Sequence, residues 1–295
     1  MSEFGFHSTA EEVTQGIDLG GTTWLVTGCN SGIGKETARV LGLRGAHVIG
    51  GARTEQKAKE ALDELGIPGT PLACDLASPT SIHDAIAQVK ESQVLLAGII
   101  ANAGIMALPA PEQAHGIELQ FYTNHFGHFA LVTGLVDRLT DDARVVVVSS
   151  GAHRYAATHG LELDNLDGTR DYEPWRAYGR SKLANILFAR TLAHRFAASG
   201  TRRTAYSLHP GVIRTNLTRH IADPDALLAP LRPSMKSIAQ GAATTLYVAT
   251  QPAIEAHSGC YFSDCAVAKT IKQGTDDALG EALWKLSEDR TAVHL

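Results

Sequence analysis

The sequence predicts an α/β protein with one doubly wound parallel sheet of about seven strands, in the order 3-2-1-4-5-6-7, and helices on both faces. Two observations carry this prediction. Short apolar runs are separated by helical patterns along the chain. Runs such as 145–148 contain no polar residue, as in strands that are buried on both faces of a sheet. A glycine-rich turn also joins the first run to a helical pattern, and 295 residues are enough for one large domain.

The elements follow in order. Residues 1–20 are predicted to be an N-terminal extension with a short helix, because Ser8-Thr9-Ala10-Glu11 has the spacing of a capping box. Residues 21–295 are predicted to form a single domain whose strands are joined by right-handed crossovers. Its strands are expected at the apolar runs 24–26, 46–49, 70–73, 95–101, 144–148, 203–208 and 259–262.

The turn after the first strand reads Thr27-Gly28-Cys29-Asn30-Ser31-Gly32-Ile33-Gly34. Glycines let a backbone turn tightly, approach a pyrophosphate closely and aim helix N-terminal amides at it. A glycine-rich turn without a ligand is the alternative, because the spacing differs from G-x-G-x-x-G.

Small or polar residues also stand where the other strands end, which is where such sheets bind ligands. These are Ala52-Arg53, Asp75-Leu76, Asn102-Ala103-Gly104 and Ser149-Ser150. Each could be an ordinary turn residue, but together they indicate a site on one rim of the sheet.

Tyr178 precedes Lys182 by four residues in a helical pattern, so the phenol and the ammonium should share one helix face. A tyrosine has a pKa of ~10, and a nearby positive charge stabilises its anion, which suits a general acid. The alternative is a coincidence on an amphipathic helix.

Taken together, these motifs resemble the short-chain dehydrogenase/reductase family, whose sheet is the Rossmann fold. The resemblance rests on the T-G-x-x-x-G-x-G turn, Asn102-Ala103-Gly104, Tyr178-x-x-x-Lys182 and His209-Pro210-Gly211. The segment 124–129 is similar to the retinol-dehydrogenase-like branch. Residues 8–14 and 261–265 look like plant members related to a chloroplast import-associated dehydrogenase.

The resemblance implies a catalytic set of four residues. Tyr178 would exchange a proton with the substrate oxygen, Ser150 would hydrogen-bond that oxygen, and Lys182 would lower the pKa of Tyr178 and bind the nicotinamide ribose. Asn124 would hold a water that links Lys182 to solvent. Ser149 is the alternative to Ser150, since neighbouring residues at a strand end face opposite ways.

The cofactor contacts carried over from the family run along the whole rim. Asp75 would meet the adenine edge, or merely cap a turn, and Thr215 would donate to the nicotinamide carboxamide. The full set is Gly28, Asn30, Ser31, Gly32, Ile33, Gly34, Arg53, Asp75, Leu76, Asn102, Ala103, Gly104, Tyr178, Lys182, Pro210, Gly211, Ile213 and Thr215.

The end of the second strand favours NADP(H) over NAD(H). No carboxylate occupies the expected ribose position in Gly50-Gly51-Ala52-Arg53, and an arginine suits the additional phosphate of NADP. Glu55 stands close enough to keep NAD(H) open as an alternative.

Two segments depart from a compact sheet-and-helix pattern. Residues 151–175 are interpreted as an inserted loop that lines the substrate entrance or is merely solvated. Residues 216–238 mix prolines with leucines and are interpreted as a mobile apolar substrate lid, with a plain surface loop as the alternative.

The composition argues against several classes of binding partner and location. A net charge of -5 without a basic block argues against nucleic acid. The charged residues 1–20 argue against a secretory signal, and no apolar run reaches the ~20 residues of a membrane span, so a cytoplasmic protein without a transmembrane segment is expected. The 4 cysteines and 13 histidines lack metal-ligand spacing, so no metal is predicted and the cysteines are interpreted as reduced and structural.

The predicted function is that of an NADP-dependent alcohol dehydrogenase or carbonyl reductase acting on a small apolar ketone, aldehyde or alcohol. The alternative is a catalytically silent NADP-binding regulatory or interaction protein on the same fold. The family commonly pairs the helices that bear Asn124 and Tyr178 between subunits, which implies a homodimer or homotetramer unless the inserted loop obstructs that contact.

Overall fold

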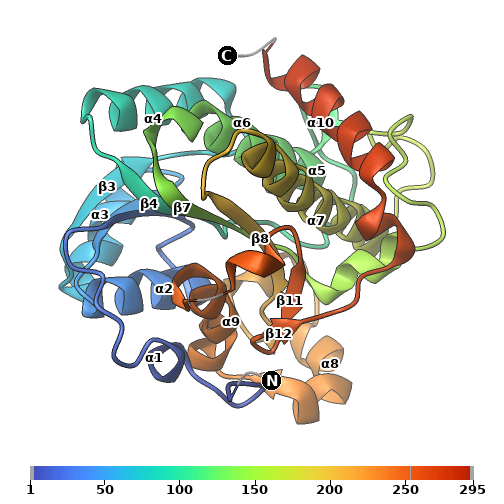
Figure 1. The fold of residues 1–295 in the computed structure, drawn as a ribbon. Helices are drawn as coiled ribbons and strands as arrows, with labels where there is room; N and C mark the ends of the chain where they lie inside the picture. Colours follow the sequence, from blue (N-terminus) through green and yellow to red (C-terminus); the bar gives the residue numbers. More distant parts are fainter. Residues whose placement is uncertain (1–2, 253, 293–295) are drawn as a thin grey trace.

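The computed structural model describes residues 3–252 and 254–292. Residues 1–2 of the predicted N-terminal extension, and residues 253 and 293–295 of the predicted domain, lie outside the described residues. In that part of the chain, eight strands form one sheet in the order β3-β2-β1-β4-β7-β8-β11-β12 (Figure 1). The strands are β1 (Thr23–Thr27), β2 (His47–Ala52), β3 (Gly69–Ala73), β4 (Leu96–Ala101), β7 (Leu139–Val148), β8 (Thr204–His209), β11 (Tyr261–Ser263) and β12 (Ala266–Val267).

Helices cover both faces of this sheet (Figure 1). Helices α2, α3 and α9 pack on one face, with the short α1 outside them, while α4, α6 and α7 pack on the other, with α10 beyond α7. The bounds are α1 (Ala10–Val13), α2 (Gly32–Leu43), α3 (Glu55–Leu65), α4 (Pro79–Glu91), α5 (Leu119–Phe121), α6 (Gly127–Gly134), α7 (Pro174–Ala198), α8 (Pro224–Leu228), α9 (Ile238–Thr250) and α10 (Asp277–Ala292).

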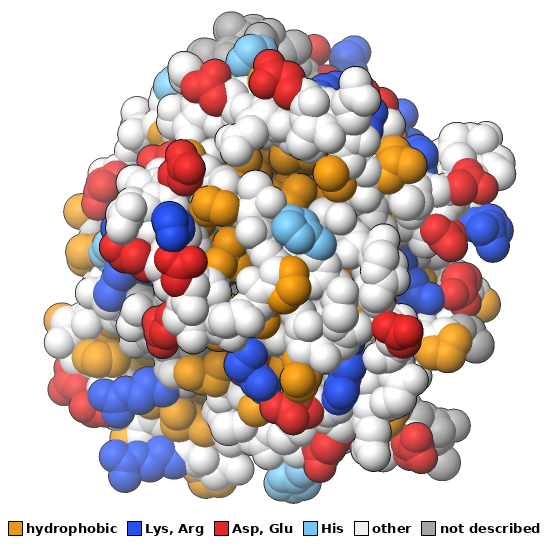
Figure 2. All heavy atoms as spheres, turned by 90° about the vertical axis from the view of Figure 1, so that its left-hand side faces the viewer, with side chains coloured by type: hydrophobic (Ala, Val, Ile, Leu, Met, Phe, Trp, Pro, Cys, Tyr) orange, Lys and Arg blue, Asp and Glu red, His pale blue; other side chains and the backbone are white. Residues whose placement is uncertain are grey.

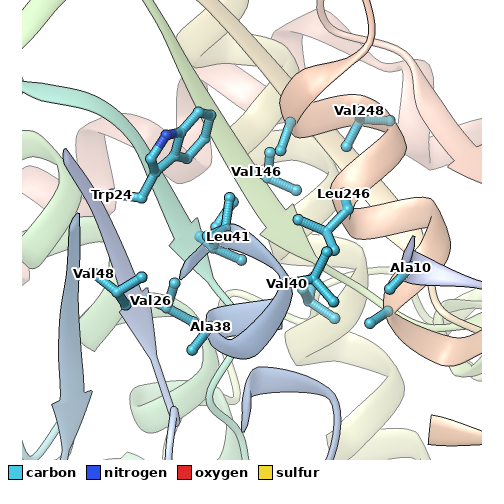
Figure 3. Packing of buried hydrophobic residues seen from close by; sticks show 14 of the residues in the cluster. Ala10, Trp24, Val26, Ala38, Val40, Leu41, Val48, Val146, Leu246 and Val248 are labelled. Atoms are coloured by element: carbon cyan, nitrogen blue, oxygen red, sulfur yellow. The ribbon is translucent and has the colours of Figure 1, made fainter. Parts of the chain in front are cut away.

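The strands are buried on both faces, which explains their unbroken apolar sequence. Trp24 and Val26 pack toward α2 and α9, whereas Leu25, between them, packs into the core on the opposite face. Figure 3 shows the first of these cores, where Val40 and Leu41 of α2 meet Leu246 of α9. The predicted fold class and the order of the first seven strands are therefore confirmed.

The eighth strand was not predicted. β12 is antiparallel to β11 and follows a two-residue turn in which Asp264 and Cys265 both have positive φ, of 52° and 58°. Such turns match the twist of a hairpin, but they are normally signalled by Asn-Gly or Asp-Gly, and Asp-Cys gives no such signal.

The boundaries of two other elements also differ from the sequence expectation. The capping box of α1 is formed by Thr9 and Glu12, one residue later than expected, because the Ser8 hydroxyl accepts from the Gly5 amide. β7 begins at Leu139 instead of residue 144, since the polar residues Thr140, Asp141 and Asp142 interrupt the apolar run near its start.

Short elements connect the layers. β5 (Gln113–Ala114) and β6 (Ile117–Glu118) form a small hairpin, and β9 (Val212–Ile213) pairs in parallel with β10 (Met235–Lys236). The surface on the side of β3 and α3 carries acidic and basic side chains intermixed (Figure 2), consistent with the small net charge. Within the described residues, no helix is long and apolar enough to cross a membrane.

Candidate active site

The glycine turn is shaped to admit a phosphate. Gly28 and Gly32 have positive φ, of 70° and 54°, and a Cβ added to Gly34 would lie 2.3 Å from the carbonyl oxygen of Gly28. Ser31 occupies the N-cap of α2, yet its side chain makes no capping hydrogen bond, so the first amides of α2 keep their donors. This set of donors and the lack of side-chain bulk fit the phosphates of a dinucleotide.

Thr27 ties this turn to the end of β4. Its hydroxyl accepts from the amides of Asn102 (2.9 Å) and Ala103 (3.0 Å), and lies 2.8 Å from Nε2 of His128. The Asn102 side chain donates to the Thr27 carbonyl (2.9 Å), so this predicted cofactor residue is engaged in fixing the rim. Thr27 and His128 were not predicted as site residues, because their role depends on a contact between distant parts of the chain.

The predicted adenosine end of the site is open. Arg53 is exposed directly after β2, and Glu55 is exposed in the first turn of α3. The Asp75 carboxylate accepts from the Ala77 amide (3.0 Å), which is the turn-capping arrangement considered as its alternative role. Leu76 is buried. A Cβ added to Gly127 would lie only 2.3 Å from the Leu76 carbonyl oxygen, so α6 packs directly against Leu76.

Tyr178 and Lys182 lie on one face of α7, as predicted. Both side chains are buried, and the Lys182 ammonium lies 5.5 Å from the centre of the Tyr178 ring. Lys182 Nζ donates to the carbonyl of Val148 (3.0 Å) at the end of β7. The predicted pair is therefore fixed against the sheet rim and not at the solvent surface.

Ser150, and not Ser149, faces the phenol. The Ser149 hydroxyl is buried and donates to the Lys182 carbonyl (2.7 Å), whereas the Ser150 hydroxyl contacts the hydroxyl of Tyr178. Gly179 makes this approach possible, because a Cβ there would lie 2.5 Å from the carbonyl oxygen of Ala152. Between the two alternatives of the sequence, the geometry favours Ser150.

Burial shifts the pKa values of both members of the pair. Burial raises the pKa of Tyr178 to about 12, opposed only by its contact with Ser150, and burial lowers the pKa of Lys182 to about 7. Removal from water therefore sets the direction of both shifts, since burial disfavours the charged form of each side chain. The lowering of the Tyr178 pKa by Lys182 stays a prediction.

Asn124 sits in a π-helical turn, Tyr122–Phe126, between α5 and α6. Its side-chain amide donates to the Ile105 carbonyl and to Ser181 Oγ, both at 2.9 Å, and its Oδ1 accepts from the Ile105 amide (2.9 Å). A Cβ on Gly104 would lie 3.0 Å from Asn124 Oδ1 and 3.7 Å from Lys182 Nζ. Asn124 is therefore brought to Gly104 and Lys182, as the predicted set requires.

The residues after β8 close the other side of the rim. Gly211 has φ 104°, and a Cβ there would meet Lys236 at 2.7 Å, which accounts for glycine after Pro210. Ile213 packs against Gly241 of α9, and Thr215 lies beside Gly32, 3.2 Å from the position of its Cβ. Thr215 is thus next to the phosphate turn.

An apolar cluster surrounds Tyr178. Met106 and Ala107, which follow β4, are buried against it, and Leu217 and Ile221 come from the 216–238 segment. The remaining members are Ala152 and Trp175. Met106 and Trp175 were missed by sequence reasoning, since neither belongs to a motif. In the part of the chain that the structure describes, no cluster of three or more His, Cys, Asp or Glu could hold a metal.

The 151–175 segment is packed, not merely solvated. It begins with a 3₁₀ helix (Gly151–Ala156), and the buried Arg180 side chain donates to the carbonyls of Leu161 (2.8 Å), Glu162 (3.0 Å) and Asn165 (2.9 Å). These bonds hold the loop against α7, immediately beside Tyr178.

This doubly wound sheet, with a phosphate-shaped turn and a tyrosine and lysine on its rim, defines a dinucleotide-binding oxidoreductase fold and site. The family model described as short chain dehydrogenase matches residues 22–161. The chain belongs to the short-chain dehydrogenase family, whose members are oxidoreductases that use nicotinamide cofactors.

Individual relatives extend the likeness over nearly the whole chain. Short-chain dehydrogenase TIC 32 B, chloroplastic, of Brassica napus is 40% identical over 97% of this chain and 93% of its own length. Retinol dehydrogenase 14 of Homo sapiens is 38% identical, over 91% of this chain and 85% of its own. The crystal structure of an uncharacterised protein from Mycobacterium paratuberculosis is 32% identical with a TM-score of 0.78, covering 95% of this chain and 97% of that one.

Proposed function

We propose that this protein is an NADP(H)-dependent oxidoreductase that interconverts a small apolar ketone or aldehyde and the corresponding alcohol, with Tyr178 as general acid and base. One observation carries the proposal: the four residues Asn124, Ser150, Tyr178 and Lys182 converge at the rim of the sheet, with an apolar cluster beside the phenol. When bound, the nicotinamide supplies or accepts the hydride.

The residues of the chain supply binding and proton transfer. The glycine turn and the first amides of α2 would hold the cofactor phosphates, and Thr215, beside Gly32, would bond to the cofactor beyond them. Ser150 would hydrogen-bond the substrate oxygen while Tyr178 protonates it, which stabilises the negative charge that develops there. The apolar cluster would hold the rest of the substrate and exclude water from the hydroxyls.

The preference for NADP(H) rests on Arg53. Arg53 is exposed at the end of β2, and among the described residues no carboxylate forms an ion pair with it. An unpaired guanidinium suits a phosphate, which it can bind with two parallel hydrogen bonds.

The test is turnover of NADPH and NADH with a panel of apolar ketones and aldehydes of increasing size, read as loss of the reduced-cofactor absorbance. Faster turnover with NADPH is expected on at least one carbonyl. Cofactor binding without turnover on any substrate would favour a catalytically silent binding protein instead.

We also propose a homodimer or homotetramer. Helix α10 restricts which contacts between subunits are possible. Arg190 and Arg195 of α7 pair with Asp277 and Glu281 of α10, both at 2.7 Å. Because α10 covers this face of α7, a pairing of α7 between subunits would have to form around α10. Light scattering of the purified protein measures the assembly.

A further inference from the structure

A cavity of about 510 Å³ lies between the glycine turn and the beginning of the 216–238 segment. Gly32 lines one wall, while Thr215, Arg219 and Ile221 are among the residues of the other. The two walls touch where the Thr215 methyl approaches Gly32. Any phosphate group held at this turn is therefore within reach of the residues of the opposite wall.

The two arginines of this cavity differ in their partners. Arg214 forms a two-point ion pair with Asp225, at 2.6 and 3.3 Å. Arg219 donates one hydrogen bond to the Asn216 carbonyl (3.0 Å), and among the described residues no carboxylate forms an ion pair with it. Since a guanidinium has five N–H donors, Arg219 keeps most of its donors for an anion.

Arg53 comes from the sheet and lies near enough to Arg219 and His220 for its charge to act on both. The amides of Gly28 and Cys29 donate to the Gly51 carbonyl, at 2.8 and 3.2 Å, so the chain leaves β2 for Arg53 directly beside the glycine turn. Burial lowers the pKa of Arg219, and the nearby charge of Arg53 lowers it further. Two like charges at this rim repel each other, and an anion bound between them would offset that repulsion by its attraction to both.

We propose that Arg219 and Arg53 together bind the 2′-phosphate of NADP(H), Arg219 from the 216–238 segment and Arg53 from the sheet. The inference rests on the proposed function, because it requires NADP(H) at this rim. The 216–238 segment would then contribute to both the cofactor site and the substrate site, because Leu217 and Ile221 flank Arg219 and pack in the apolar cluster of Tyr178. Binding of the phosphate therefore holds one wall of the substrate site in place.

The experiment compares Arg219→Gln with Arg53→Gln, and with Arg232→Gln as the matched control, because Arg232 is an exposed arginine of the same segment. Dissociation constants of NADPH, NADH and 2′,5′-ADP are measured by calorimetry. We expect Arg219→Gln and Arg53→Gln each to weaken NADPH and 2′,5′-ADP about 10- to 100-fold and NADH less than about 2-fold. Arg232→Gln should change none of them.

Hydrogen exchange provides a readout that does not depend on catalysis. In the unmutated protein, 2′,5′-ADP should slow exchange of the amides of residues 216–221, and in Arg219→Gln this protection should be lost. Equal weakening of NADPH and NADH by Arg219→Gln, or no change in either, would overturn the inference. If the unmutated protein binds neither nucleotide, the proposed function itself fails.

Discussion

Lys182 and Arg219 are two basic side chains beside the same rim of the sheet, and the protein holds them in different ways. Lys182 is buried in α7, with its ammonium on the Val148 carbonyl, and its neighbours bond to residues far away in the chain. Arg219 is exposed on a segment whose hydrogen bonds mostly join residues three positions apart, such as Thr218 to Thr215. The reacting groups are thus set by the global fold, whereas the 216–238 segment depends on local bonds and on what it covers.

The largest expected effect is on catalysis in the buried region. Replacing Tyr178 with Phe removes the proton donor without changing the shape of the site, so kcat should fall about 100- to 10,000-fold. The dissociation constant of NADPH should stay within about 2-fold of its original value. Tyr155→Phe is the control, because that side chain is 58% exposed, and its kcat should be unchanged. Steady-state kinetics measures both; an active Tyr178→Phe protein would refute the assigned role.

Arg180 tests how firmly the buried region is held. Arg180→Ala leaves three carbonyls of the 151–175 segment without their donor, and the free energy of unfolding should fall by roughly 2–4 kcal/mol. Urea unfolding measures this. Arg170→Ala is the matched control, since its ion pair with Asp164 on the same segment is solvent-exposed and should contribute nothing measurable. Similar losses in the two variants would show that the segment is not held by Arg180.

The pH dependence of stability tests the burial of Lys182. Its pKa falls from 10.5 to about 7 on folding, so between those pH values the unfolded chain binds more protons than the folded one. Stability from this group therefore rises with pH across that window. The free energy of unfolding of the unmutated protein, minus that of Lys182→Met, should increase from about pH 7 to about pH 9. A constant difference in urea unfolding would mean that Lys182 is not desolvated.

The smallest effects on stability are expected in the 216–238 segment. Leu217→Ala removes part of an apolar wall that is only partly buried, so the free energy of unfolding should change by less than about 1 kcal/mol. The KM for an apolar substrate should instead rise several-fold, while kcat changes little. Leu231→Ala is the control, because Leu231 is 38% exposed on the same segment and outside the cluster. An unchanged KM in Leu217→Ala would separate this segment from the substrate.

Local motifs made much of the fold and of the candidate site predictable from sequence. The glycine turn and the Tyr178–Lys182 pair are short-range patterns, so their positions on a turn and on one helix face followed from spacing alone. The β11–β12 hairpin was missed because its turn lacks the usual residues. Met106, Trp175 and Arg219 belong to no motif, and only the folding of distant segments brings them to the site.

The net rise of the Tyr178 pKa could not be predicted from sequence for a related reason. Helical spacing shows that two side chains are neighbours but gives no measure of how completely water is removed from them. The choice between Ser149 and Ser150 likewise required the position of the Lys182 carbonyl, which no sequence pattern reveals.

The parallel pairing of β9 and β10 has a consequence for how such proteins diversify. Val212 lies opposite Met235 and Ile213 opposite Lys236, and Lys236 is anchored by an ion pair with Asp264. The two ends of the intervening stretch are thus clamped side by side, and lengthening a loop between fixed ends costs little free energy. We therefore expect that residues 214–234 can be replaced by the corresponding stretch of another family member without unfolding the sheet, and that such a graft changes the selectivity for substrate, and for cofactor through Arg219, more than the proton transfer at Tyr178.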